Sequence, residues 1–403
     1  MPRRHDIDAL RILAFALVML YHVGMYYVAG WHWHLKSPQA QEWLQIPMRA
    51  LNLWRMDLVF LVSGLALGLL QRSRSGAQGL LGSRSRRLLL PLAFGMAVVV
   101  PYQAYAQAVA NGSVAPGLAD FLARYFTGGP WPRGAFDGAE FGVTWNHLWT
   151  LPYLWVYTAL VVLAVPWLRS PPAQRLQARF LALRGGRLAW PVAPLMAASL
   201  LLWPHFPPTH DLIADAWLHA VYFTVFLYGW WMGTDAGWWD ELKRLRAPLL
   251  AAALLMMALH FGLRAAALEA PQPALRMATR LAADAAKWAM LLAILGWACH
   301  ALNRPWRWLP WANEQVFPWY VLHQTVTIAL IVALAPLGLP LGWEAMLLLA
   351  GTVAGCWSVT AVVRRIGVLR PLFGLKRATS LASARPRCPS PATPAHPAAH
   401  SGE

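Results

Sequence analysis

The sequence predicts an all-α, polytopic membrane protein with about ten transmembrane helices, and three observations carry this prediction. Of the 403 residues, 58% are hydrophobic and only 13% are charged, which is about half the charged fraction of a typical soluble domain. Runs of about twenty mostly apolar residues recur along the chain, each long enough to cross a bilayer. The net charge of +17 is spread very unevenly over the connections between them. Disordered chains and basic nucleic-acid-binding domains lack such runs, so both classes are excluded.

The predicted spans share an apolar composition and a length near that of a bilayer-crossing helix. They are expected at 9–30, 51–70, 88–110, 148–168, 187–204, 216–233, 247–267, 283–302, 316–335 and 342–363. The fifth is short and contains three prolines, so its limits are the least defined. The first follows Arg3 and Arg4 but is too long for the apolar region of a signal peptide. No cleavage site follows it, so we expect it to be retained as a span.

The basic residues between the spans predict how the chain is oriented. With the N-terminus inside, the inner segments hold 24 Lys and Arg residues and the outer connections hold 6. Cytoplasmic loops of membrane proteins carry such an excess, so both termini are expected to be cytoplasmic. Residues 1–377 are expected to form one membrane domain. Residues 378–403, rich in Pro, Ala and Ser, are expected to form a disordered cytoplasmic tail.

The outer connection at 111–147 is the largest of these loops and is rich in Gly and aromatic residues, which predicts a partly ordered cap. The three cysteines, Cys299, Cys356 and Cys388, show no spacing typical of a disulfide framework or a zinc site.

Arg11 and His22 are two ionisable residues of the first span, where such residues are costly. Eleven helical steps bring them to within about 20° of one face, separated by about 16 Å along the axis. Arg11, at the inner boundary, could hold a phosphate, and Asp8 could orient its guanidinium. His22, deeper in the bilayer, could take a proton from a hydroxyl. Alternatively, Arg11 anchors the span and His22 is a packed interior residue, and the spacing alone leaves both interpretations open.

The second span carries Arg55 and Asp57 at a depth comparable to His22. Asp57 could orient His22 or pair with Arg55, although residues two apart on a helix face different directions. The neighbouring Ser63–Gly64 pair predicts close packing against another helix. In the eighth span, Asp284 and Lys287 are three residues apart and are expected to form an ion pair.

A basic cluster, Arg84, Arg86 and Arg87, lies at the inner mouth of the third span. It fits either a topology signal with affinity for anionic lipid or a docking site for a polyphosphate. Asn146 and His147 lie at the outer end of the fourth span, just above the expected bilayer core, and His323 lies within the ninth span. For each histidine, a structural hydrogen bond is the alternative to catalysis.

The outer segment WHWHLKSP, at 31–38, carries two tryptophans that could stack on sugar faces. Its two histidines, His32 and His34, have no cysteine or carboxylate close in sequence, so no metal site is expected.

Five sequence blocks, in this order, resemble those of the acyltransferase-3 family of integral membrane acyltransferases. The blocks are DALR (8–11) followed by His22, DLVFLVSG (57–64), RSRRLLLP (84–91), HLW (147–149) and YVLHQ (320–324). The resemblance covers roughly residues 5–375. WHWHLKS, NHLW and YVLHQ are most similar to the glucan biosynthesis protein C branch, whose members add succinyl groups to periplasmic glucans.

The resemblance implies an enzyme of the bacterial inner membrane that moves an acyl group, succinyl or acetyl, from cytoplasmic acyl-CoA to a hydroxyl of a periplasmic or cell-surface glycan. Acyl-CoA is the co-substrate, and neither a bound cofactor nor a nucleic-acid partner is expected. The residues implied in catalysis are His22, Asp57 and His323. Those implied in acyl-CoA binding are Arg11, Asp8, Arg84, Arg86 and Arg87. Those implied in acceptor binding are Arg55, Trp31, Trp33, Asn146, His147 and Trp149.

One position departs from the family pattern. Many members carry an acidic residue shortly after the tryptophan of the fourth span, where this chain has Leu154 in WTLPYLWVY. The acceptor therefore stays open, as does the choice between His22 as general base and His22 as a transiently acylated nucleophile. Two other functions also stay open: a transporter of a small anion or acyl group, and a non-catalytic partner of a glycan-modifying enzyme. The lack of an internal repeat speaks against transport.

Overall fold

The computed structural model describes residues 4–73, 79–233 and 235–376, and within these ranges every regular element is a helix. The predicted tail at 378–403 lies outside the described residues. Seven helical segments of the described chain are long and apolar enough to cross a membrane: His5–Tyr27, Glu42–Gln71, Leu80–Ala110, Ala236–Glu269, Pro273–Ala301, Leu309–Leu337 and Leu341–Arg365. The expected all-α, polytopic membrane fold is confirmed.

The three other predicted spans are helical, but their helices are shorter than the seven segments above. The segment at 148–168 forms α7 (Thr150–Leu163) and the single turn α8 (Val165–Leu168). The segment at 187–204 forms the end of a 3-10 helix (Gly185–Ala189) and the ten-residue α10 (Val192–Leu201), because Pro191 precedes α10 and Pro204 follows it. The segment at 216–233 forms the 17-residue α11 (Ala216–Met232).

The α-helices follow one another along the chain, with longer connections between α1 and α2, between α6 and α7, and between α10 and α11. They are α1 (His5–Tyr27), α2 (Gln45–Asn52), α3 (Arg55–Ser73), α4 (Leu80–Phe94), α5 (Pro101–Ala110), α6 (Leu118–Phe126), α7, α8, α9 (Pro171–Leu181), α10, α11, α12 (Ala236–Arg244), α13 (Arg246–Glu269), α14 (Pro273–Ala301), α15 (Leu309–Leu334), α16 (Leu341–Arg365) and α17 (Leu369–Leu372).

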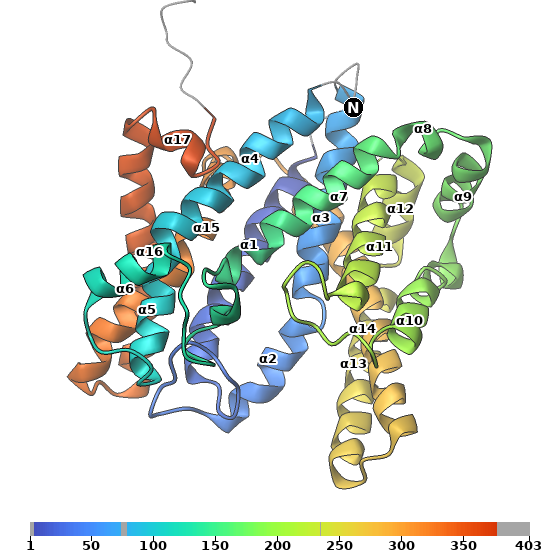
Figure 1. Cartoon of the computed structure of the whole chain (residues 1–403). Helices are drawn as coiled ribbons and strands as arrows, with labels where there is room; N and C mark the ends of the chain where they lie inside the picture. Colours follow the sequence, from blue (N-terminus) through green and yellow to red (C-terminus); the bar gives the residue numbers. More distant parts are fainter. Residues whose placement is uncertain (1–3, 74–78, 234, 377–403) are drawn as a thin grey trace, which may run out of the picture.

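Helix α1 occupies the middle of the bundle, where it packs against α15, α3 and α14 (Figure 1). Around it, α3 packs along α11, α15 along α16, and α4 along α7, while α13 and α14 form an antiparallel hairpin. The start of α1 lies at one end of the bundle. Helix α2 and the connection between α13 and α14 lie at the opposite end (Figure 1). The two ends of α1 therefore face different ends of the molecule.

The connection at 111–147 is ordered, as predicted. It contains α6. Four of its own residues, Phe121, Tyr125, Trp131 and Phe136, form an aromatic cluster. Because aromatic rings bury a large area with few rotatable bonds, this cluster holds the long connection against α5.

Helices α3 and α11 approach so closely that only glycine fits at their contact. A Cβ on Gly64 would fall inside contact distance of the Phe226 carbonyl oxygen, and one on Gly229 would fall against the Leu61 carbonyl oxygen. Small residues permit such backbone approach between membrane helices. The predicted packing role of Ser63–Gly64 is confirmed, and this contact places Arg55 and Asp57 at the start of α3 beside α11 and α14.

We expect Gly64→Ala to lower the thermal unfolding temperature of the detergent-solubilised protein, because the added methyl group collides with the α11 backbone. Overpacking of this kind costs about 1–3 kcal/mol. Gly262→Ala in α13 is the matched control, since a Cβ there meets nothing within 4 Å. The control is expected to be neutral or slightly stabilising. Equal behaviour of the two variants would contradict the close α3–α11 contact.

Candidate active site

A cavity of about 1500 Å³ runs between the helices that surround α1. Near the start of α1 it is lined by Arg4, Arg11, Arg84, Arg87 and Lys376, and we call this part the Arg11 end. At the opposite end of the bundle it is lined by Arg49, Arg55, Arg264 and Arg280, and we call this part the Arg280 end. His22 lines the cavity between the two ends.

His22 on α1 and His323 on α15 form the central contact of the cavity. His22 Nδ1 lies 2.8 Å from His323 Nε2, and the two rings are stacked with centroids 5.0 Å apart. His323 is fully buried, whereas His22 is partly exposed to the cavity. The sequence alone did not predict that these two histidines, 301 residues apart, are direct partners.

The backbone of α15 fixes which nitrogen carries each proton. His323 Nδ1 lies 2.9 Å from the Tyr320 carbonyl oxygen and 3.1 Å from that of Trp319. A carbonyl oxygen only accepts, so neutral His323 is protonated at Nδ1 and its Nε2 accepts from His22 Nδ1. Neutral His22 then has an unprotonated Nε2, and no described residue hydrogen-bonds to that atom. His22 can therefore accept a proton from a molecule in the cavity.

His147 is fixed by the same segment of backbone. Its Nε2 donates to the carbonyl oxygens of Tyr320 and Val321 at 3.1 and 3.2 Å. Its Nδ1 accepts from Gln103 at 3.3 Å. The Tyr320 carbonyl is thus shared by two histidines, and the Tyr320 hydroxyl also binds the Thr150 hydroxyl and the His147 carbonyl, both at 2.5 Å.

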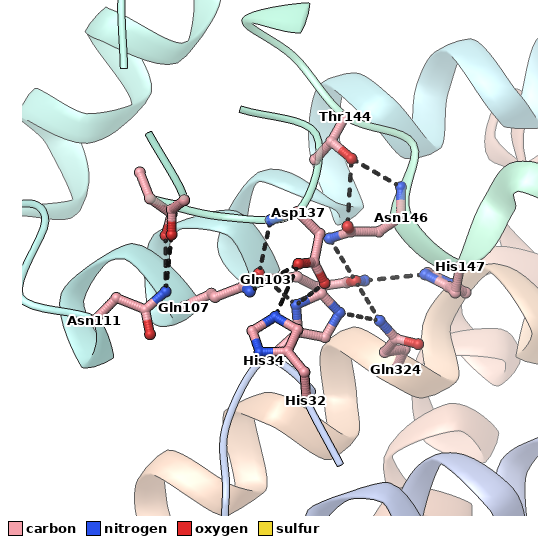
Figure 2. Close-up of polar contacts among 12 residues, drawn as sticks. His32, His34, Gln103, Gln107, Asn111, Asp137, Thr144, Asn146, His147 and Gln324 are labelled. Atoms are coloured by element: carbon pink, nitrogen blue, oxygen red, sulfur yellow. Dashed lines mark hydrogen bonds and ion pairs between the residues drawn. The ribbon is translucent and has the colours of Figure 1, made fainter. Parts of the chain in front are cut away.

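Gln103 and Gln324 extend this arrangement into a buried amide network (Figure 2). Gln103 Oε1 accepts from Gln324 at 3.0 Å and from Asn146 at 3.2 Å. Gln324 also donates to His34 Nε2 at 2.8 Å. His147 and Asn146 are thereby joined to α5, α15 and the 31–38 loop, and Asn146 does not line the cavity.

The network ends at the loop residue Asp137. His34 Nδ1 donates to Gln107 at 2.6 Å, and Gln107 Nε2 donates to Asp137 at 3.1 Å. His32 lies 3.2 Å from the same carboxylate. Burial lowers the pKa of His34, which favours the neutral ring that accepts from Gln324. Both histidines of WHWHLKSP thus have hydrogen-bond partners, and in the described ranges no group of three potential metal ligands is assembled.

At the Arg11 end, Asn313 of α15 joins the two ionisable residues that begin α1. Arg11 Nη1 donates to Asn313 Oδ1 at 3.1 Å, and Asn313 Nδ2 donates to Asp8 Oδ1 at 3.1 Å. The side-chain amide of Asn313 therefore connects Asp8 to Arg11, the residue that Asp8 was predicted to orient. Sequence spacing within α1 gave no sign of Asn313, which comes from a segment about 300 residues away.

The three arginines of the predicted basic cluster differ in position. Arg84 and Arg87 line the cavity and lie within electrostatic range of Arg11. The buried Nε of Arg84 has no hydrogen-bond partner. Arg86 is exposed and does not line the cavity.

Asp57 lines the cavity, but its ionic partner is Lys287 of α14. Lys287 Nζ lies 3.4 Å from Asp57 and 3.6 Å from Asp284, so the predicted Asp284–Lys287 pair is confirmed. The Nδ1 of His22 is already engaged by His323. The structure therefore places Asp57 against Lys287 rather than against His22 or Arg55, because the carboxylate faces α14.

Arg55, at the Arg280 end of the cavity, is almost fully buried. Its guanidinium lies over the ring of Tyr21 at 3.6 Å, and Nη2 donates to Asn52 at 3.2 Å. Its Nε and Nη1 have no hydrogen-bond partner. Trp31, Trp149 and Leu154 also line the cavity. Trp33 is buried away from it, in the contact between the 31–38 loop and α15–α16.

We expect Gln324→Leu to lower the thermal unfolding temperature, because it removes the donor to buried His34 Nε2 and one of the two donors to buried Gln103 Oε1. Each unsatisfied buried group costs about 1–3 kcal/mol. Gln174→Leu, on the exposed face of α9, is the matched control and should change little. If both variants unfolded at the wild-type temperature, the amide network would not stabilise the fold.

Comparison with known proteins bears on the whole of this arrangement. The profile of the acyltransferase-3 family, described as an acyltransferase domain, matches residues 4–361. No curated protein and no solved structure matches the chain significantly. The matched range includes the cavity-lining parts of α1, α3, α4, α14 and α15. With most of its length matched, the chain belongs to the acyltransferase-3 family of membrane acyltransferases.

Proposed function

We propose that this protein is an O-acyltransferase that moves an acyl group from acyl-CoA to a hydroxyl of an extracytoplasmic glycan, with His22 as general base. The observation that carries the proposal is the state of His22. Its Nδ1 is engaged by His323, and its Nε2 keeps a lone pair beside a large cavity. A base of this kind suits the deprotonation of an attacking hydroxyl.

The reaction needs one proton to move out to His22 and back. As the acceptor oxygen attacks the thioester carbonyl carbon, His22 Nε2 takes the hydroxyl proton. The tetrahedral adduct collapses, the carbon–sulfur bond breaks, and the coenzyme A sulfur leaves with the proton held by His22. The hydrogen bond from His22 Nδ1 to His323 persists throughout, so it stabilises the imidazolium that forms in between. His22, His323 and the substrates suffice for this proton transfer.

The Arg11 end is the proposed position of the acyl-CoA phosphates. Arg11, Arg84 and Arg87 bring three positive charges together there, and the free Nε of Arg84 is a donor without a partner. Guanidinium groups bind phosphates through paired hydrogen bonds. Arg86, which is exposed beside them, is proposed to attract the donor electrostatically. The arm of acyl-CoA that joins the phosphates to the thioester would then extend about 16 Å along α1, the axial distance from Arg11 to His22.

The finer identity of the reaction is proposed from the sequence blocks. By analogy with the glucan biosynthesis protein C branch, we propose succinyl as the acyl group, with acetyl as the alternative, and a periplasmic glucan as the acceptor. The excess of basic residues in alternate connections supports a bacterial inner-membrane protein with a cytoplasmic N-terminus. In that orientation the Arg11 end faces the cytoplasm, where acyl-CoA is made.

We expect His22→Ala to reduce acyl transfer by about 10²- to 10⁴-fold, the usual contribution of a positioned base. The measurement is transfer of label from radioactive acyl-CoA to glycan by the purified protein. His300→Ala, on the exposed face of α14, is the control for substitution of a histidine and should be fully active. Wild-type transfer by His22→Ala would remove His22 from the mechanism.

We expect Arg11→Gln to raise the KM for acyl-CoA by about 10- to 100-fold, since a hydrogen bond to a charged group contributes about 1.5–3 kcal/mol. Asn313→Ala should shift the same KM less, because Asn313 only orients Arg11. The KM for the acceptor should stay constant in both variants. If the KM for the acceptor rose instead, the Arg11 end would bind the acceptor and not acyl-CoA.

Transport remains the second candidate, because the cavity has charged linings at both ends of the bundle. The protein reconstituted in vesicles separates the two functions. Covalent label in the glycan supports the enzyme, whereas passage of intact labelled solute without covalent transfer supports a transporter. Transfer by the purified protein alone would also exclude a role as a non-catalytic partner.

A further inference from the structure

The Arg280 end of the cavity gathers four arginines from four different helices. Arg49 comes from α2, Arg55 from α3, Arg264 from α13 and Arg280 from α14. Three of these charges, Arg49, Arg264 and Arg280, act electrostatically on the same side chain, His260 of α13. Arg55 and Arg280 likewise act on one side chain, Tyr222 of α11. The four positive charges therefore belong to one site, although they are far apart in the sequence.

Three of these guanidinium groups lie over the faces of aromatic rings. Arg49 lies 4.8 Å from the Trp31 ring, Arg55 lies 3.6 Å from Tyr21, and Arg280 lies 3.8 Å from Trp217. A cation over a ring is attracted by the ring's electrons, and this contact does not consume its N–H groups as hydrogen-bond donors. The buried Nε and Nη1 of Arg55 and the buried Nε of Arg280 indeed have no hydrogen-bond partner.

Carboxylates compensate the charge of this site only in part. Asp57 and Asp284 act electrostatically on Arg280, but each forms its ion pair with Lys287, and two carboxylates face the five cations of Lys287 and the four arginines. Within the described residues, none of the four arginines has an ion pair within 4.0 Å. A buried cation without a partner is costly, and like charges lining one cavity repel each other. A bound anion would remove both costs.

We propose that the acceptor carries a phosphate or carboxylate group, and that Arg49, Arg55, Arg264 and Arg280 bind that anion. This inference rests on the proposed transfer to a glycan. The geometry suits it, because Arg55 adjoins the ring of Tyr21, the residue next to His22, so an anion held there places the rest of the acceptor beside the base. Trp31 and Trp149 line the same cavity and offer ring faces to a sugar.

The test is direct binding without acyl-CoA, so its result does not depend on whether acyl transfer occurs. The full-length protein in phosphatidylcholine nanodiscs is dialysed against radiolabelled glucose, glucose 6-phosphate or glucuronate. We expect each anionic sugar to bind at least about 10-fold more tightly than glucose, the contribution of one charge-assisted pair. Equal binding of the three sugars would overturn the proposal.

Variants then locate the anion. Arg264→Gln and Arg280→Gln should abolish the preference for the charged sugars, and Arg280→Lys should restore part of it because the charge returns without the planar fork. Arg276→Gln is the matched control, an exposed arginine one turn from Arg280 that does not line the cavity, and it should bind like wild type. Thermal unfolding of each variant confirms that it is folded.

Two results would place the anion or its source elsewhere. Loss of the preference through Arg87→Gln, with Arg264→Gln unaffected, would mean that the probe binds at the Arg11 end, and the proposal would fail. Loss of the wild-type preference for charged sugars in nanodiscs that contain phosphatidylglycerol would show that a lipid headgroup occupies the site, and the anionic acceptor would be wrong. Unchanged binding in phosphatidylglycerol discs supports the glycan.

Discussion

The hydrogen bond from His323 to the α15 backbone is the constraint on which the rest of the site depends. Because the Tyr320 and Trp319 carbonyls only accept, His323 must donate through Nδ1 and accept through Nε2. That order obliges neutral His22 to donate through Nδ1 and to present the lone pair of Nε2. His147 donates to the same Tyr320 carbonyl and limits its movement. A stretch of main chain, which cannot change its protonation, thus sets the state of the proposed base.

The sequence predicted the elements of this site better than their pairing. Helical periodicity placed Arg11 and His22 on one face, and both line the cavity. A three-residue spacing predicted the Asp284–Lys287 pair. The partners of His22 and Asp57 are on other helices, and local spacing carries no information on such tertiary contacts. Gln103 and Gln107 could have been noticed, since two polar residues one turn apart inside an apolar span are costly unless they are hydrogen-bonded.

Helix lengths were the weaker part of the fold prediction, for a physical reason. An apolar run shows that a segment is compatible with a nonpolar environment, whereas prolines and packing decide where its helix begins and ends. The run at 187–204 is interrupted by prolines near both ends, and its α-helix is limited to the ten residues of α10. Helix α11, in contrast, ends three residues after Gly229, whose backbone lies against that of Leu61 in α3. This close contact leaves the two backbones little room to move relative to each other. Composition alone cannot distinguish these cases.

The two cationic ends of the cavity are built differently, and this difference bears on what each can bind. At the Arg11 end, Arg11 donates a hydrogen bond to Asn313, which also binds Asp8, while Arg4 lies over the ring of Trp239 and Arg87 over that of Phe317. At the Arg280 end, aromatic rings fix arginines by their faces and leave most of the edge donors free. Arg11 is thus positioned by an amide from another helix, whereas the Nε groups of Arg55 and Arg280 have no partner among the described residues. A positioned arginine suits the constant phosphates of acyl-CoA, and unpartnered donors from several helices suit an anion carried by the acceptor.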